Sequence, residues 1–294
     1  MKYRHAYMIM AHHRPDLLQL LIDALDDERN DIFIHVDKKS DMCLSLFTTQ
    51  RAKLVFIEQI DVRWAGYSQV ECEYRLLEAA VKSGKHLYYH FLTGATYPLW
   101  NQDDLHQFFL KHEGTEFIGF DNARDYSNRA KYFWFLSEYG KLQGVKGRMI
   151  GLIRGTLLRL QKLSGYNRLK NRDIVIKKGC AYWSITESLA QYILSKEDYV
   201  RILLKDALWC DEVFVQTLAF NSPFRAKIYD LNNEYDGAMR ELAWPSNVGG
   251  DHPGYNFKME DLEYLLSSKR LFALKFENED GISLINEIRN RRNI

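Results

Sequence analysis

The amino-acid sequence predicts one α/β domain with a mostly parallel central sheet and helices on both faces of the sheet. The chain has 294 residues, of which 46% are hydrophobic and 14% aromatic, which suits a large packed core. Apolar runs of strand length alternate with segments whose apolar residues recur at helical spacing. This alternation is typical of βαβ units, in which both faces of each strand are buried.

The N-terminal third contains the clearest alternation. "HAYMIMA" predicts a first strand, and Pro15 then opens a helix whose leucines fall on one face. A second amphipathic helix, "SQVECEYRLLEAAVKSG", ends at Gly84. Four further strands are expected, the last of them after another helix, at residues 31–37, 53–57, 86–94 and 116–120. The carboxyl ends of such strands form the ligand-binding edge of an open α/β sheet.

The middle of the chain is strongly basic. Between Lys141 and Arg172 there are nine Lys or Arg residues and no Asp or Glu. Within this stretch, residues 147–163 place four apolar side chains on one face of an expected helix, namely Ile150, Ile153, Leu157 and Leu160. A basic amphipathic helix can lie on an anionic membrane surface, and it can equally be a solvated basic face over ordinary core contacts.

Two short strands are expected after the basic stretch, at residues 173–179 and 181–186, and helices follow as far as Phe220. No internal repeat or low-complexity linker interrupts the chain. We therefore expect a single domain over residues 1–294. Its parts are an N-terminal part at about 1–120, a basic insert at about 121–172 and a C-terminal part at about 173–294.

Several functional classes lack their motifs. The net charge of +1 implies no general attraction to nucleic acid. No G-x-G-x-x-G, Walker or G-x-S-x-G motif occurs, and no D-x-D pair is present to hold a metal ion against a diphosphate. We therefore expect neither a metal nor a cofactor. Four scattered cysteines predict free thiols, and the absence of a signal peptide or spanning segment predicts a cytoplasmic location.

The run "LWCDEVFVQTL" places two adjacent carboxylates before a segment of helical apolar spacing. Acidic residues favour helix starts without any catalytic role, because the helix dipole and unpaired N–H groups attract them. A carboxylate can also act as a general base, and Arg240 and Lys275 are cations that could receive a leaving anion. Taken alone, each of these charges is more often structural, so the residues by themselves leave open whether Asp211 or Glu212 caps the helix or acts as a base.

An ordered set of motifs resembles the core-2/I-branching enzyme family. The motifs are "AYMIMAHHRP", "IFIHVDKKSD", "VRWAGYSQVE", "YYHFLTGATYPL", "GCAYWSIT", "CDEVFVQTL", "MREL" and "LFALKF", which cover nearly the whole chain in the right order. This family comprises inverting β-glycosyltransferases, among them the peptide-O-xylosyltransferases. The resemblance implies a GT-A-like nucleotide-sugar transferase fold in a variant that lacks D-x-D and needs no metal. It makes the part at about 1–120 the nucleotide-binding half and the part at about 173–294 the acceptor and catalytic half.

Position by position, the resemblance implies a role for each matching residue. The glutamate of the "DE" motif, which is Glu212, is the catalytic base, and we then expect Asp211 to be the helix cap. Arg240 and Lys275 hold the donor diphosphate. Asp37 lies in the nucleoside pocket beside the strand end formed by Ala11 and His12.

The resemblance is weaker on the acceptor side. It assigns acceptor contacts to Trp64, Tyr182 and Trp183. Cys180 stands where the family has a serine, and residues 122–134 do not align. The acceptor's identity therefore does not carry over.

The expected reaction is transfer of a sugar such as N-acetylglucosamine or xylose from a UDP-sugar to a glycan hydroxyl. The sequence does not decide between these donors. The acceptor is a polysaccharide or lipid-linked glycan precursor, and residues 141–172 could give peripheral contact with the inner face of the membrane. Two alternatives stay open: a protein of the same fold that only hydrolyses its donor, and a non-catalytic nucleotide-sugar or carbohydrate-binding protein.

Overall fold

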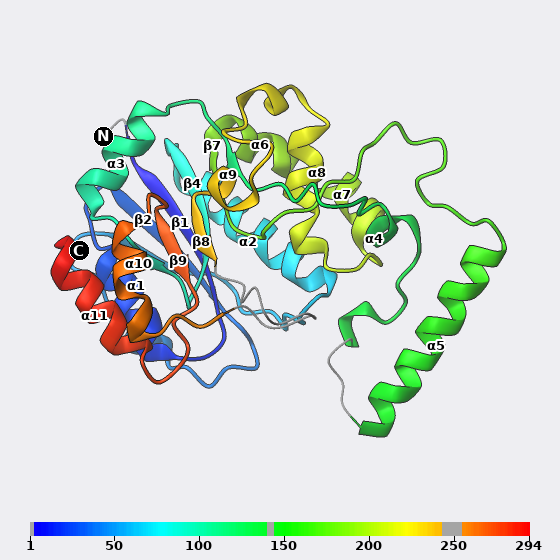
Figure 1. The fold of residues 1–294 in the computed structure, drawn as a ribbon, viewed down its shortest axis with the longest axis horizontal. Coiled ribbons are helices and arrows are strands. Elements are labelled where there is room, and N and C mark those ends of the chain that lie inside the picture. Colours follow the sequence, from blue (N-terminus) through cyan, green and yellow to red (C-terminus); the bar gives the residue numbers. More distant parts are fainter. Residues whose placement is uncertain (1–2, 140–143, 243–254) are drawn as a thin grey trace.

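The computed structural model describes residues 3–139, 144–242 and 255–294, so Lys141 of the basic stretch lies outside the described residues. The central sheet has six strands in the order β3-β2-β1-β4-β7-β6 (Figure 1). Their bounds are β1 (His5–Ala11), β2 (Asn30–Val36), β3 (Lys53–Phe56), β4 (Tyr88–Thr93), β6 (Phe117–Ile118) and β7 (Trp183–Thr186). Strands β1 to β4 are parallel, whereas β7 runs antiparallel to β4 and to β6. The predicted α/β class with a mostly parallel sheet is confirmed.

Helices cover both faces of this sheet, as the buried strands predict. One face packs against α2 (Tyr67–Ser83), α6 (Glu187–Ser195), α7 (Glu197–Leu204) and α8 (Phe214–Phe220). The other face packs against α1 (Pro15–Ala24), α3 (Gln102–Lys111) and a second sheet. All seven residues of β2 are buried, which is why Ile32, Phe33 and Ile34 form an apolar run without alternation.

The second sheet has three strands in the order β5-β9-β8, with bounds β5 (Tyr97–Pro98), β9 (Phe272–Leu274) and β8 (Arg240–Leu242). Short helix α9 (Glu234–Ala238) leads into β8, and α10 (Leu262–Ser267) and α11 (Gly281–Arg292) pack beside this sheet. Strand β9 lies between β5 and β8. The C-terminal part of the chain therefore returns to the central sheet (Figure 1). Residues from both ends of the sequence therefore meet at one edge.

The strand expected at residues 173–179 does not form. Within this segment only Lys178 makes an isolated bridge, with Asp121. The backbone of Val175 bonds to the side chain of Asn221, and the backbone of Lys177 bonds to the hydroxyl of Thr217. Side chains at and beyond α8 thus satisfy the polar groups that a neighbouring strand would otherwise pair, so the apolar pattern here reflects packing against a helix.

The basic stretch forms the expected helix, α5 (Gly144–Leu163), after the short helix α4 (Asn128–Lys131). It projects from the rest of the molecule (Figure 1), and none of its residues is buried. Of the four apolar residues expected to share a contact face, Ile153 and Leu160 are exposed. Among the described residues, no helix combines the length and apolar character that crossing a bilayer requires.

Candidate active site

Three strand ends meet at the carboxyl edge of the central sheet. The backbone N–H of Asp37, just past β2, donates to the carbonyl of Ala11 at the end of β1 over 2.8 Å. The N–H of Gly94, just past β4, donates to the carbonyl of Met10 over 2.9 Å. A Cβ on Gly94 would lie only 3.2 Å from the Cβ of Ala11. The small residues at these positions let the strand ends converge. Ligands of open α/β sheets bind at this carboxyl edge of the strands.

Asp37 is buried at this edge, and hydrogen bonds from nearby residues hold its carboxylate in place. Its carboxylate accepts from the backbone N–H and from the ammonium group of Lys39, and more weakly from the N–H of Val62. These bonds fix the position of the carboxylate, so a ligand meets a preformed acceptor.

Lys275 reaches the same edge from the end of β9. Its ammonium group lies 3.8 Å from one oxygen of Glu277, and the imidazole of His13 lies 3.0 Å from the other. Burial, together with His13 and Lys275, lowers the pKa of His12, while Glu277 and Asp37 oppose this shift. His12, Asp37 and Lys275, which are far apart in sequence, are therefore within electrostatic reach of one another.

Arg240 lies deeper, between the two sheets. Its side chain is 0% exposed. It donates to the carbonyls of Ala238 and Trp183 and to the hydroxyl of Ser184, and its guanidinium lies over the ring of Phe272. Its Nε has no hydrogen-bond partner in the described part of the chain. Burial lowers the pKa of Arg240 to about 10. The structure thus places a fully buried cation with a spare donor in the core, beside Trp183 and Ser184.

The second part of the site surrounds Glu212, at the end of a short 3₁₀ turn (Cys210–Glu212) that leads into α8. The Nη1 of Arg129 donates to the Oε2 of Glu212 over 2.6 Å, and the Glu212 side chain stays 33% exposed. Lys178 faces the same carboxylate. Burial alone would lower the pKa of Lys178, but the charges of Glu212, Glu234 and Asp121 raise it by more, so its pKa lies above the usual value. Glu212 is therefore a partly exposed carboxylate with two cations beside it.

Asp211 is not the helix cap that the sequence predicts. It lies inside the 3₁₀ turn, and the residues that precede the turn and α8 make no side-chain capping bond. Its Oδ2 accepts from the amide of Gln69, whereas its Oδ1 is buried and has no hydrogen-bond partner among the described residues. Burial and the adjacent charge of Glu212 raise the pKa of Asp211 to about 7. Both residues are half-buried, but their environments differ: one oxygen of Asp211 is buried, whereas the side chain of Glu212 is 33% exposed and ion-paired.

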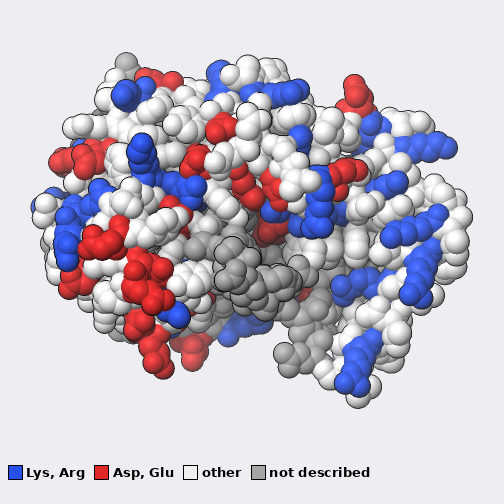
Figure 2. Space-filling view, in the orientation of Figure 1, with Lys and Arg blue, Asp and Glu red and all other residues white. Residues whose placement is uncertain are grey.

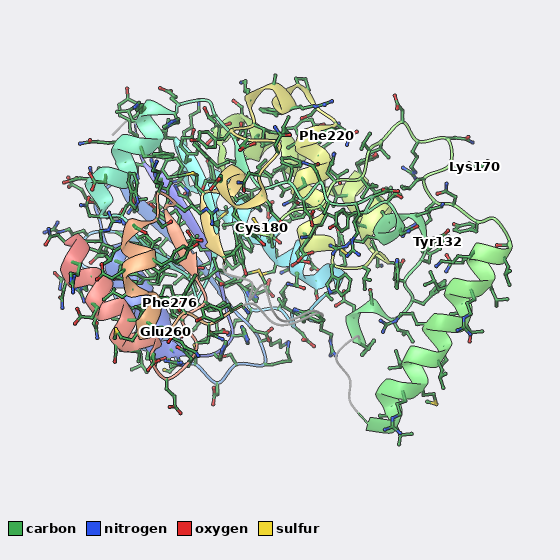
Figure 3. All side chains as sticks on the ribbon, in the orientation of Figure 1. Tyr132, Lys170, Cys180, Phe220, Glu260 and Phe276 are labelled. Carbon is green, nitrogen blue, oxygen red and sulfur yellow. The ribbon has the colours of Figure 1, made fainter. Side chains whose placement is uncertain are left out.

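Tyr182 lies between the two parts of the site. Its hydroxyl bonds to Thr93, and it interacts electrostatically with both Asp211 and Glu277. Cys180, near the centre of the molecule in Figure 3, is buried, and burial raises the pKa of its thiol to about 12. The thiol that stands in the family's serine position is thus protonated.

The two tryptophans expected at the acceptor side lie in different surroundings. Trp183 is buried: its ring stacks on Phe91, and its indole N–H donates to the buried carboxyl of Glu73. Trp183 is therefore part of the core, which does not fit the expected acceptor contact. Trp64 is exposed and meets Trp209 edge to face, with ring centroids 6.3 Å apart. Arg129 lies over the ring of Trp209, so Trp64 stands close to Glu212.

Sequence reasoning missed the two cations beside Glu212. Arg129 lies in the stretch 122–134 that does not align with the family motifs, and Lys178 lies in the segment expected to be a strand. Each is distant from Glu212 in sequence, and neither belongs to a periodic pattern. Among the described residues, no group of three or more His, Cys, Asp or Glu side chains is placed to hold a metal ion.

Comparison with protein-family models identifies the family. The model described as "Branch: Core-2/I-Branching enzyme" matches residues 5–263. The chain belongs to the core-2/I-branching enzyme family. Membership confirms the resemblance carried by the motifs.

No curated protein matches the chain. Among solved structures, it is similar to TarS of S. aureus, with 10% sequence identity and a TM-score of 0.33. The match covers 98% of this chain but only 39% of that one. The chain thus spans less than half the length of that structure.

Proposed function

We propose that this member of the family is an inverting, metal-independent transferase that moves a sugar from a UDP-sugar to a glycan hydroxyl, with Glu212 as the general base. The observation that carries the proposal is the contrast within the acidic pair. Burial raises the pKa of Asp211, whose Oδ1 is out of contact with solvent, whereas the side chain of Glu212 is 33% exposed and paired with Arg129. A general base must reach the acceptor hydroxyl, and the exposed part of the Glu212 side chain supports this role.

In the proposed reaction, the acceptor oxygen attacks the anomeric carbon from the face opposite the leaving diphosphate. Its proton passes to Glu212 as the new C–O bond forms. The bond between the anomeric carbon and the diphosphate oxygen breaks, and the electron pair leaves with UDP. Because the attacking and leaving oxygens lie on opposite faces, the configuration at the anomeric carbon inverts.

The donor is proposed to lie along the strand edge. Asp37 would accept hydrogen bonds from the nucleoside, beside Ala11 and His12. Lys275, half-buried at the mouth of this edge, would pair with the diphosphate as a point charge. Arg240 would supply its free Nε–H, and the two cations would neutralise the charge that develops on the leaving group.

The acceptor is proposed to enter from the side of Trp64 and Tyr182, near Glu212. Exposed Trp64 offers an apolar face on which a sugar ring can stack. The proposed acceptor class is a polysaccharide or lipid-linked glycan precursor, and N-acetylglucosamine and xylose remain equal candidates for the transferred sugar.

A panel of UDP-sugars, assayed by mass spectrometry with glycan acceptors in the presence of a chelator, tests the proposal. We expect transfer from at least one donor and an inverted product. UDP release that needs no acceptor would instead identify a donor hydrolase. UDP-sugar binding without turnover under any of these conditions would identify a binding protein.

A further inference from the structure

Helix α5 (Gly144–Leu163) presents an apolar stripe away from the rest of the molecule. At about 100° per residue, positions spaced by three and four lie on one face of a helix. The outward stripe follows this spacing over the whole helix, through Val145, Met149, Leu152, Thr156, Leu160 and Leu163. Its apolar members are strongly exposed, with Val145 at 80%, Leu152 at 72% and Leu163 at 84%.

The opposite face of α5 is fixed to the protein. Gln161 donates to the carbonyl of Phe133 and accepts from its backbone N–H, and Arg154 donates to the carbonyl of Leu136. Ile150 and Leu157 on this side are partly buried. The orientation of the helix is thus set by its inner contacts, and the outer stripe is left without a partner among the described residues.

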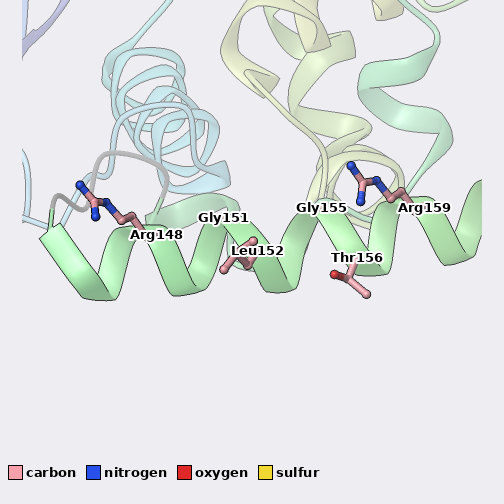
Figure 4. A pocket seen from close by; sticks show the side chains of 6 residues that line it. All are labelled: Arg148, Gly151, Leu152, Gly155, Thr156 and Arg159. Carbon is pink, nitrogen blue, oxygen red and sulfur yellow. The ribbon is translucent and has the colours of Figure 1, made fainter.

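Basic side chains flank the stripe. Arg148 and Arg159 lie along one side of it and Lys146 along the other, and no acidic residue occurs from Gly144 to Arg172. Figure 2 shows basic side chains spaced along this helix. Between the two arginines, Gly151 and Gly155 leave a shallow depression of about 480 Å³ (Figure 4).

We propose that α5 docks on the surface of an anionic lipid bilayer, with its apolar stripe in the headgroup region and its flanking cations on lipid phosphates. An apolar stripe with cations at its sides is what an interfacial helix needs. A second copy of the same helix would bring like charges together. Nucleic acid would leave the apolar stripe without a partner. Each engaged Lys or Arg strengthens binding to an anionic surface by about fivefold.

Docking of α5 on a bilayer would also fix the position of the active site, because one segment of the chain connects α5 to Glu212. The segment from Arg129 to Leu136 contacts Glu212 at one end, through Arg129, and α5 at the other, through Phe133 and Leu136. Figure 3 shows Tyr132 of this segment between α5 and the rest of the molecule. A docked helix would hold the active site near the bilayer, where a lipid-linked acceptor is confined. Only this last step rests on the proposed function.

Co-sedimentation of the full chain with vesicles of phosphatidylcholine, alone or mixed with phosphatidylglycerol, tests the docking. We expect binding to the anionic vesicles alone, weakened by salt because exposed charges are screened. Arg148→Glu with Arg159→Glu should weaken it at least about tenfold. Leu152→Ser with Leu160→Ser should weaken it without changing the net charge.

A matched control carries the same charge change off the helix, Lys170→Glu with Arg172→Glu, and should keep most of the binding. Equal recovery of the wild type in the supernatant with both vesicle types at low salt would overturn the proposal. Loss of binding in the control alone would also do so. Concentration-dependent dimers without vesicles, abolished by the Leu152 and Leu160 changes, would assign the stripe to a second copy. Transfer to a water-soluble acceptor should be equal in all variants, which separates this test from that of the proposed function.

Discussion

Replacing Arg240 by Met removes a buried cation that no described carboxylate neutralises. Burial lowers the pKa of Arg240 from its ordinary 12.5 to about 10, which corresponds to a cost of about 3 kcal/mol for keeping the charge in the folded protein. The variant also loses the hydrogen bonds to Ala238, Trp183 and Ser184, each worth about 1 kcal/mol. These effects offset each other, so we expect Arg240→Met to change the free energy of unfolding by no more than about 2 kcal/mol.

Arg240→Met should lower the affinity for the donor nucleotide, in contrast to its limited net effect on stability. A charge-assisted hydrogen bond to the second phosphate contributes about 1.5–3 kcal/mol, so Arg240→Met should weaken UDP binding by about 10- to 150-fold. Binding of UMP, which lacks that phosphate, should change much less. Calorimetric titration of both nucleotides and a denaturant melt of the apoprotein measure the two effects.

Arg270→Met is the matched control, because Arg270 pairs with Asp236 and Glu241 and lies outside the proposed donor site. Removing it leaves the buried carboxylate of Glu241 without its cation, so the control should lower stability and keep UDP affinity. The reasoning is refuted if Arg240→Met is strongly destabilised while its folded fraction binds UDP as tightly as the wild type. Arg240 would then be a structural residue.

Three further predictions concern the donor and the acidic pair. UDP should bind equally well in chelator and in added manganese or magnesium by calorimetry, and a collapse of affinity on metal removal would refute the metal-free site. Lys275→Ala should weaken UDP binding about tenfold and UMP binding less, because its contact is with the diphosphate, and equal losses would place the side chain elsewhere. Burial and Glu212 raise the pKa of Asp211 to about 7, so the folded state keeps a proton that the unfolded state releases above about pH 4. Wild-type stability should therefore fall, relative to Asp211→Asn, by about 1.4 kcal/mol per pH unit from about pH 4 to 7 in denaturant melts, whereas parallel pH curves would contradict this.

The sequence predicts elements whose patterns are local. Five of the six central strands appear near the residues expected from "HAYMIMA" to "EFIGF", and "AYWSIT" contains the sixth. The basic helix also follows directly from its composition. Patterns of this kind depend on neighbours within one element, and these are visible in a single sequence.

What the sequence does not predict depends on distant partners. The apolar segment at residues 173–179 resembles a strand, but Asn221 and Thr217 take up its backbone bonds. Asp211 resembles a cap, but a 3₁₀ turn encloses it beside Gln69. The pairing of Arg129 with Glu212 joins residues from a stretch without any motif. Tertiary contacts decide each of these, and local propensity carries no record of them.

The central claim is that Glu212 takes the proton of the acceptor hydroxyl. The most direct measurement is the transfer rate of Glu212→Gln at saturating UDP-sugar and acceptor, alongside its UDP affinity. A general base contributes about a hundredfold or more, so we expect at least that loss in rate with nearly unchanged UDP binding, while Asp211→Asn keeps most of its activity. Full transfer by Glu212→Gln, or loss confined to Asp211→Asn, would contradict the assignment of the base.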